Sequence, residues 1–449
     1  MPYLLNILYF ALLVAVSPWL AYAAIRKGKY LAGFAEKFLG LVPKRAADDE
    51  SPCVWIHAVS VGEAALISSL VKRLHAERPH WRIVISTTTH TGLETARKKY
   101  PDVTSFYCPL DFSWAVRAAV RRLRPNLLVL AELELWPNLI AAANEADVPV
   151  AVVNGRLGER SFRGYRRVKP LMSRLLNRLD VVAVQNEEYR ERFAALGCEP
   201  HRLATTGSLK FDGAVSDRRN ANTVRLGELA GVSVGDVVFL AGSTQEGEEA
   251  AALEAYRTAV VEFPRLRLIL VPRHPDRFAD VAELGRSSGF RFRRRTELDG
   301  LNRPQLAAEP WQVLLVDAIG ELGAWWGLAH IAFVGGSFGN RGGQNMLEPA
   351  AYGAAVSFGP NTWNFRDIAA ALVGAGGAEV VADPASLESF VGRCLRDPAF
   401  AAQLGERARR LVAANLGATE RTTALLLPLV DRQVATSREI QGSAKSRAA

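Results

Sequence analysis

The chain has 449 residues, of which 49% are hydrophobic and 22% charged, and this apolar content excludes a disordered or low-complexity protein. Its length exceeds the about 100–200 residues of an ordinary domain, so at least two domains are expected. Four widely spaced cysteines exclude a disulfide-rich scaffold, and the net charge of +9 favours anionic partners such as nucleic acid, acidic lipid or phosphorylated substrates.

The first predicted element is the uncharged stretch Tyr3–Ile25. As a helix rising about 1.5 Å per residue, it could span a bilayer core about 30 Å thick, which predicts a membrane anchor over residues 1–25. A cleavable signal peptide would carry basic residues before the apolar run, whereas here they follow it. The alternative is a helix that docks on the body of the protein or lies in the membrane interface.

Basic residues then outnumber acidic ones, and between Arg26 and Arg45 the only acid is Glu36. By the positive-inside rule this segment stays in the cytoplasm, which predicts a single-pass protein whose body lies on the cytoplasmic side. The basic segment would then lie against the anionic head groups of membrane lipids.

Beyond Pro43, short apolar runs alternate with amphipathic stretches, which predicts parallel α/β sheets built from right-handed crossover units. In the first half, strands are predicted at Cys53–His57, Arg82–Thr87, Leu127–Ala131, Pro149–Val153 and Val181–Val184. In the second half, they are predicted at Val237–Ala241, Leu266–Val271, Val313–Val316, Ile331–Val334 and Ala355–Phe358. So many strands favour two doubly wound domains over one large sheet.

The polar stretch Asp212–Thr223 is poor in apolar residues and is the predicted linker between the domains. The predicted organisation is therefore an anchor over 1–25, a first domain over 26–212, a linker over 213–223, a second domain over 224–440 and a tail over 441–449. Ligands of this fold class bind outside the carboxyl ends of the strands, so a cleft between the domains is the expected site.

Polar residues follow predicted strands of the first domain. Glu63 comes after a turn at Gly62, in the first turn of a helix, where it is either a helix cap or a general base. The positive end of that helix should keep its carboxylate ionised at neutral pH. Glu132 directly follows a strand, and Lys210 lies beside the linker, where a lysine could also be merely solvated.

Three segments of the second domain predict a nucleotide site. Ala241–Glu249 has a glycine and hydroxyls before a helix, a pattern that can bring backbone N–H groups to a phosphate. Arg273 follows a strand and could bind a phosphate through two bonds, or belong to a proline-stabilised turn. The glycines of Gly335–Pro349 permit close approach of backbone to ligand, and Glu348 could accept bonds from a ribose diol or cap a helix.

No metal site is predicted, because the histidines show no paired-ligand spacing such as HExxH. The basic segment Arg156–Arg178 is either a solvated helix face or a patch for lipid phosphates. Nucleic acid is not expected as a partner, because no aromatic platform or RNA-binding motif accompanies the positive charge.

An ordered series of motifs resembles the 3-deoxy-D-manno-octulosonic acid (Kdo) transferases of lipopolysaccharide synthesis. No single motif is decisive, but the series keeps the family order over nearly the whole chain. The motifs are WIHAVSVGE (Trp55–Glu63), ISTTTHTG (Ile85–Gly92), ELELWPN (Glu132–Asn138), TGSLKFD (Thr206–Asp212), AGSTQEGEE (Ala241–Glu249), VPRHPDRF (Val271–Phe278), GGSFGNRGGQNMLEPAAYG (Gly335–Gly353) and FGPNTWNF (Phe358–Phe365).

The resemblance implies a GT-B type glycosyltransferase with two Rossmann-like domains, held at the cell inner membrane by a transmembrane helix. It implies CMP-Kdo as donor, a lipid A precursor (lipid IVA) as acceptor, inversion at the anomeric carbon, and no metal or other cofactor. Glu63 would be the general base, and Glu132 and Lys210 would support the transition state. The CMP-binding residues would be Pro272, Arg273, Ile319, Gly320, Glu321, Asn345, Met346, Leu347 and Glu348.

The chain departs from the family pattern at a few positions. Gln245 and Gln344 stand where the family usually has histidine, and glutamine cannot become an imidazolium. Ala131–Glu134 also lacks the threonine usual in the family. Two other functions stay open: a related enzyme with a UDP or GDP donor, and a catalytically inactive membrane scaffold of the same fold.

Overall fold

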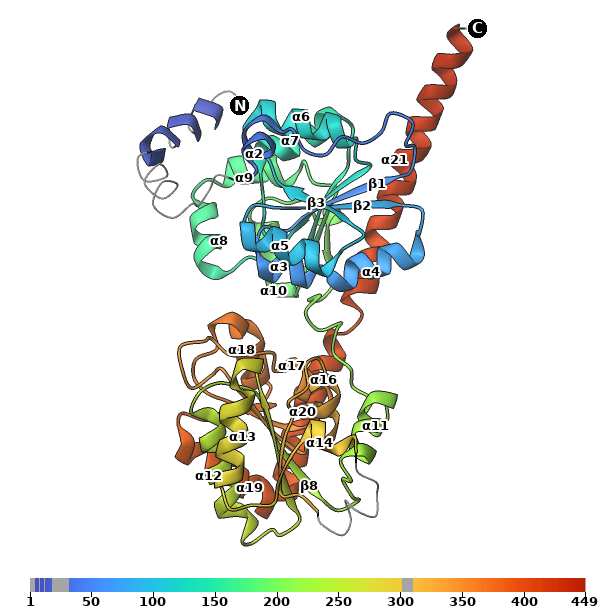
Figure 1. Ribbon diagram of the computed structural model, residues 1–449. Coiled ribbons are helices and arrows are strands. Elements are labelled where there is room, and N and C mark those ends of the chain that lie inside the picture. Colours follow the sequence, from blue (N-terminus) through green and yellow to red (C-terminus); the bar gives the residue numbers. More distant parts are fainter. Residues whose placement is uncertain (1–4, 8, 12, 18–31, 301–309, 449) are drawn as a thin grey trace. The chain divides into compact units, whose positions relative to one another are not determined.

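The computed structural model describes residues 5–7, 9–11, 13–17, 32–300 and 310–448. The chain forms two compact units, which are described separately (Figure 1). Unit 1 comprises Met1–Gly213 and Leu416–Ala449, and unit 2 comprises Ala214–Asn415. Each unit contains a seven-stranded parallel sheet, which confirms the predicted α/β class.

The sheet of unit 1 has the strand order β3-β2-β1-β4-β5-β6-β7. Its strands are β1 (Cys53–His57), β2 (Arg82–Thr87), β3 (Thr104–Tyr107), β4 (Leu127–Ala131), β5 (Val150–Gly155), β6 (Val181–Val184) and β7 (Leu203–Thr205). Its helices include α2 (Phe34–Leu39), α3 (Val61–Leu66), α4 (Ser68–Glu77), α5 (His90–Lys99), α6 (Ser113–Leu123), α7 (Pro137–Glu145), α8 (Glu159–Arg166), α9 (Lys169–Leu176), α10 (Glu187–Ala195) and α21 (Ala418–Ala448).

Both faces of this sheet are covered, so its central strands are apolar throughout, as parallel sheets require. Trp55 and Leu128 belong to one core cluster, together with residues of α6 and α7. Val54 and Ile56, which alternate with Trp55 along β1, belong to the other cluster, with residues of α4 and α21. This burial on both faces fixes β1 and β4 and therefore the loops that follow them.

The sheet of unit 2 has the order β10-β11-β9-β8-β12-β13-β14. Its strands are β8 (Val237–Thr244), β9 (Leu266–Pro272), β10 (Phe292–Arg294), β11 (Val313–Leu315), β12 (Ile331–Val334), β13 (Ala355–Phe358) and β14 (Ala378–Val380). Its helices include α11 (Ala221–Leu229), α12 (Glu248–Val260), α13 (Phe278–Ser287), α14 (Arg295–Leu298), α16 (Leu322–Trp325), α17 (Leu347–Ala351), α18 (Arg366–Gly374), α19 (Pro384–Arg396) and α20 (Pro398–Asn415).

The predicted bounds of the second domain (224–440) and of the tail (441–449) differ from the division that the structure shows. From Leu416 on, the chain belongs to unit 1, and α21 continues as a helix to Ala448, through the predicted tail. The reason is a set of contacts across the sequence: the Asp212 carboxylate accepts the N–H groups of Gly417 (2.7 Å) and Ala418 (3.3 Å). Leu426 is fully buried in the core cluster on the α4 face.

The second half of the predicted linker, 213–223, is not a free connection but is packed into unit 2. Arg218 donates to the backbone carbonyls of Tyr352 (2.8 Å), Gly327 (3.0 Å) and Ala329 (2.7 Å), and Thr223 is buried in the first turn of α11. The segment therefore becomes part of unit 2 soon after Gly213.

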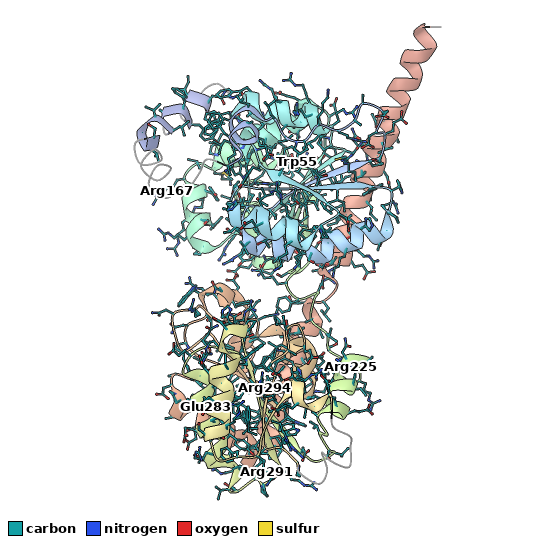
Figure 2. All side chains as sticks on the ribbon, viewed as in Figure 1. Trp55, Arg167, Arg225, Glu283, Arg291 and Arg294 are labelled. Carbon is teal, nitrogen blue, oxygen red and sulfur yellow. The ribbon has the colours of Figure 1, made fainter. Side chains whose placement is uncertain are left out.

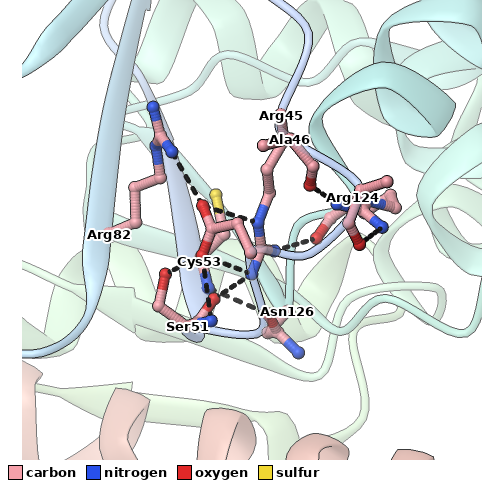
Figure 3. Close-up of polar contacts among 9 residues, drawn as sticks. Arg45, Ala46, Ser51, Cys53, Arg82, Arg124 and Asn126 are labelled. Atoms are coloured by element: carbon pink, nitrogen blue, oxygen red, sulfur yellow. Dashed lines mark hydrogen bonds and ion pairs between the residues drawn. The ribbon is translucent and has the colours of Figure 1, made fainter.

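Arg45 belongs to the predicted basic segment but is buried at the amino end of β1 (Figure 3). Its guanidinium donates to the carbonyls of Arg124 (3.0 Å) and Ser51 and forms an ion pair with Asp49. Asn126 accepts the Cys53 N–H at 2.8 Å in the same cluster (Figure 3). Arg45 therefore fixes the entry into β1, and this cation is not free to meet lipid head groups.

The predicted membrane span lies partly outside the described residues. Residues 5–7, 9–11 and 13–17 are helical, and 18–25 are not among the described residues. Within the described part of the chain, no helix has the length and apolar character needed to cross a bilayer.

Candidate active site

In doubly wound folds, ligands bind outside the carboxyl ends of the strands, at the point in the middle of the sheet where the strand order reverses. In unit 1 this point lies between β1 and β4, and in unit 2 it lies between β8 and β12. Glu63 follows β1 and Glu132 follows β4, so the fold brings two predicted catalytic residues to the same edge.

Glu63 lies in the first turn of α3 and caps the start of that helix. The Ser60 hydroxyl accepts the Glu63 N–H at 3.3 Å, and the Glu63 carboxylate accepts the Val59 N–H at 2.8 Å and the Ser60 hydroxyl at 2.9 Å. Glu63 therefore has the helix-capping role that the sequence suggested as one of two alternatives. It leaves the basicity of the carboxylate available, since each oxygen retains a free lone pair.

The ionisation of Glu63 differs from the sequence expectation. The pKa of Glu63 is raised to about 7, chiefly by burial and also by the negative charges of Glu134 and Glu132, against the hydrogen bonds from Val59 and Ser60, which lower it. The expected effect of the helix terminus is outweighed, because removing a carboxylate from water disfavours its charged form. A carboxylate with a pKa near neutral pH is suited to accept and release protons.

Lys210 lies against Glu132, as an ion pair with 3.8 Å between Nζ and Oε1. The two residues are distant in sequence, and the fold joins them. Glu132 has a left-handed backbone conformation with φ of 55°, which few residues other than glycine adopt. Its N–H donates to the Val153 carbonyl at 2.9 Å, which ties this turn to β5.

Glu134 was not predicted as a site residue, although it is the second acid of the motif Glu132–Asn138. Trp136 Nε1 donates to its carboxylate at 2.9 Å, and burial raises the pKa of Glu134. The Trp136 ring meets the buried His57 edge-on, with 5.5 Å between ring centroids. Burial lowers the pKa of His57 to about 4, so the histidine supports this tryptophan as a neutral ring.

In unit 2, the buried carboxylate of Glu248 holds the glycine-rich loop, which is the part of Gly335–Pro349 between β12 and α17. It accepts the backbone N–H groups of Gln245 (2.8 Å), Gly336 (2.7 Å), Ser337 (2.9 Å) and Phe338 (3.0 Å). A Cβ atom on Gly335 would lie 2.6 Å from Glu248 Oε2, so only glycine fits there. Of the segment Ala241–Glu249, whose N–H groups were predicted to meet a phosphate, the Gln245 N–H is therefore already bonded to Glu248.

Replacing Glu248 by glutamine should destabilise unit 2. The amide retains one acceptor oxygen, so N–H groups of the glycine-rich loop lose their partner at about 1–3 kcal/mol for each unsatisfied group. Thermal unfolding should therefore shift down by several degrees, about 2–4 °C per kcal/mol for a unit of this size. Glu246→Gln, at an exposed position two residues earlier, is the matched control and should unfold as the wild type does. An unchanged unfolding temperature for Glu248→Gln would contradict this role.

Arg273 follows β9 with its side chain exposed. Its N–H donates to the Thr244 carbonyl at 3.0 Å, which holds it beside the end of β8. Among the described residues, no ion pair to its guanidinium is found, whereas nearby Arg277 is bound to the buried Glu249 at 3.0 Å. Arg273 is thus the cation of this strand end that a ligand could engage.

The other predicted CMP-binding residues fall into two groups. The side chains of Pro272, Met346 and Leu347 are buried, and Glu321 is held by Arg295 through two bonds of 2.9 Å. These side chains hold the loops in shape.

The second group can reach a ligand. Asn345 donates to Glu348 at 3.0 Å, and burial raises the pKa of Glu348. A Cβ on Gly323 would lie 3.7 Å from Glu348 Oε2, so the start of α16, which follows the loop at Ile319–Glu321, adjoins this pair. Ile319 is 80% exposed, and Gly320 has a φ of 86°.

The model of the 3-deoxy-D-manno-octulosonic-acid transferase family (kdotransferase) matches residues 32–213. The 3-deoxy-D-manno-octulosonic acid transferase of Haemophilus influenzae is 34% identical over 383 residues, which are 85% of this chain and 88% of the relative. The chain belongs to the Kdo transferase family. The transferase of Bordetella pertussis is also 34% identical, over 90% of this chain and 94% of the relative. This Kdo transferase is therefore an enzyme, a glycosyltransferase.

A solved structure shows the fold of this Kdo transferase to be GT-B-like. The UDP-GlcNAc 2-epimerase of Neisseria meningitidis, bound to UDP-GlcNAc, matches with a TM-score of 0.53 and 11% identity, over 84% of this chain and 100% of that chain. The C-terminal CMP-Kdo binding domain of WaaA from Acinetobacter baumannii has 29% identity and a TM-score of 0.39, over 43% of this chain and 98% of that chain.

The departures from the family pattern adjoin the glycine-rich loop of the Kdo transferase. The Gln245 N–H is one of the groups bonded to Glu248. The Gln344 side chain lies 3.2 Å from the position that a Cβ on Gly336 would take. Gln344 therefore lies within the loop, and Gln245 is linked to it through the carboxylate of Glu248.

The basic segment Arg156–Arg178 of the Kdo transferase is largely at the surface. No residue of α8 is buried, and Arg167, at its end, lies at the surface of unit 1 (Figure 2). Arg163 pairs with Glu159 at 2.8 Å. In the described residues, no group of three or more His, Cys, Asp or Glu side chains could hold a metal ion.

Proposed function

We propose that the enzyme transfers Kdo from CMP-Kdo to a lipid A precursor with inversion, with Glu63 as general base and without a metal. The observation that carries this proposal is the group formed by Glu63, Glu132 and Lys210 at the strand-order reversal of unit 1. As the acceptor hydroxyl forms its bond to the anomeric carbon, its proton moves to Glu63, and the bond from that carbon to the CMP phosphate breaks.

Glu132 and Lys210 would support the transition state. The ammonium group of Lys210, 3.8 Å from the Glu132 carboxylate, is a suitable partner for the carboxylate of Kdo. Glu132 would hold this lysine in position before the donor binds, and its own negative charge helps to raise the pKa of Glu63.

The donor would be held by unit 2. Arg273 can stabilise the charge that develops on the leaving CMP phosphate, because its guanidinium has no ion pair among the described residues. Glu348, oriented by Asn345, can accept hydrogen bonds from the ribose diol of cytidine. The loop at Ile319–Gly320 leads into α16, whose Gly323 adjoins Glu348, and would complete the site.

The test is mass spectrometry of lipid products after incubation with CMP-Kdo and a lipid A precursor. We expect Kdo-modified lipid from the wild type. The absence of product with every lipid acceptor would instead favour an inactive scaffold. Thermal-shift titration with CMP, UMP and GMP separates the donors, and stabilisation by UMP or GMP but not by CMP would favour another nucleotide sugar.

The pH dependence of transfer follows from the raised pKa of Glu63. Only the deprotonated carboxylate accepts a proton, and burial raises its pKa to about 7, so the active fraction grows as the pH rises through 7. We expect kcat/KM to increase from about pH 5.5 and to level off about one unit above pH 7. Initial rates across this range check it, and a flat profile below pH 7 would contradict Glu63 as the titrating base.

We further propose that the enzyme is attached to the cell inner membrane through its N-terminal segment, with the body on the cytoplasmic side. Ile7 and Phe10 are 66% and 59% exposed and offer apolar side chains to lipid. Contacts of Asn6 and Tyr9 with unit 1 favour the docked or interfacial helix over a helix that spans the bilayer. Deleting residues 1–25 should move the protein to the soluble fraction.

The docked helix and the spanning helix can be separated by labelling. All four native cysteines are buried, so a Pro2→Cys variant offers one reactive thiol. A membrane-impermeant maleimide should label it only in opened cells if the helix is docked. Labelling in intact spheroplasts, from the outer side of the inner membrane, would instead favour a spanning helix.

A further inference from the structure

The N-terminal helical residues and the rest of unit 1 together line an open apolar cavity of about 350 Å³. Leu13 and Val16 line it from the helix side. The body contributes residues after β3 and after β4, namely Leu110, Phe112, Leu135 and Trp136. This volume lies within the about 300–1,000 Å³ typical of small-molecule pockets.

Hydrogen bonds fix the helix over this cavity. The Asn6 side chain donates to the Ser113 hydroxyl at 2.7 Å and accepts the Ser113 N–H at 3.0 Å. The Tyr9 hydroxyl donates to Asp111 at 3.1 Å, and the same carboxylate accepts the N–H groups of Asn138 (3.0 Å) and Leu139 (2.8 Å). The polar side chains of the helix therefore serve its docking.

A second cavity of about 280 Å³ shares Tyr9, Leu135 and Pro137 with the first. Its lining includes Arg174 and Arg178, on and just after α9, and both side chains are exposed. An apolar lining that ends at the side chains of Arg174 and Arg178 fits an amphiphilic ligand with an apolar chain and an anionic head group.

We propose that the first cavity binds one fatty acyl chain of the lipid acceptor, with an acceptor phosphate at Arg174 and Arg178. This inference rests on the proposed function. The lipid acceptor is the expected ligand because Trp136 links the cavity to the candidate active site. Trp136 lines the cavity, and its Nε1 donates to the Glu134 carboxylate at 2.9 Å. Chain binding would thus set the position of the acceptor sugar relative to Glu63.

The Val16→Trp substitution would narrow the cavity. We expect Val16→Trp to lower kcat/KM for the acylated acceptor by about tenfold or more, since several methylene groups of the chain lose their burial. For the matching deacylated disaccharide bisphosphate, kcat/KM should stay within about twofold, because that acceptor has no chain to place. Val14→Trp, at an exposed position of the same helix, is the control. Equal losses for both acceptors, or no loss, would overturn the proposal.

Photo-crosslinking tests the cavity without relying on transfer. An acceptor with a diazirine on an acyl chain is bound to the full-length protein in vesicles, irradiated and mapped by mass spectrometry. We expect label on Leu13, Val16 or Phe112, competed by unlabelled acceptor and reduced in Val16→Trp. Label elsewhere, or equal competition by a phospholipid, would overturn the proposal. Label in the cavity of a wild type that transfers no Kdo would leave the cavity standing and refute only the proposed function.

Discussion

Replacing Glu63 by glutamine should lower the rate of Kdo transfer by about 10²–10⁴-fold. Glutamine keeps the shape of the side chain and an oxygen that can accept the Val59 N–H, so the start of α3 should persist. The amide cannot take the proton of the acceptor hydroxyl. The loss should therefore appear in kcat, measured with saturating CMP-Kdo and lipid acceptor.

Two measurements distinguish loss of the base from loss of the fold. CMP binding should stay near the wild-type value, because the predicted nucleotide residues belong to unit 2. Thermal unfolding should also stay within a few degrees. If the variant unfolds, Glu63 acts as a structural cap; if transfer stays near wild type, the base lies elsewhere, and Glu132 is the next candidate.

Replacing Arg273 by alanine should weaken the binding of CMP-Kdo by about 1.5–3 kcal/mol, or about 10–150-fold. The guanidinium is exposed at the end of β9, so its removal breaks no ion pair within the described residues. The loss should appear as a higher KM for the donor, with the KM for the acceptor unchanged.

Two further variants sharpen this prediction. Arg273→Lys retains the charge without the planar fork and should lose less affinity than Arg273→Ala. Arg286→Ala, on α13, removes a surface arginine that pairs with Glu283 and should leave the donor KM unchanged. An unchanged donor KM in Arg273→Ala would remove this residue from the phosphate site.

The sequence predicted the strands that are buried on both faces and missed short strands with few apolar residues. Cys53–His57 and Ile331–Val334 were predicted to the residue, because continuous apolar runs are typical of central parallel strands. Phe292–Arg294 has two arginines in three residues and is a strand because it pairs with β11. Such tertiary stabilisation leaves no local pattern to detect.

The candidate site likewise has features that the sequence predicted and features that it could not predict. Glu63, Glu132 and Lys210 could be singled out from motifs at strand ends, and the fold joins Glu132 to Lys210. The raised pKa of Glu63 could not be predicted, because it depends on burial and on neighbours that only the folded chain supplies. Glu248 was not predicted as a site residue, because its partners at Gly336–Phe338 lie far along the sequence.

The return of α21 to unit 1 sets an order for folding during synthesis. Unit 2 is one continuous stretch of chain, Ala214–Asn415, and can complete its core as soon as it leaves the ribosome. Unit 1 is emerging first but lacks Leu426 and Val430, which fill the core cluster on its α4 face. That apolar face must stay uncovered until α21 has been made, after the whole of unit 2. We therefore expect nascent unit 1 to expose more apolar surface to aggregation and to chaperones during synthesis than unit 2 does.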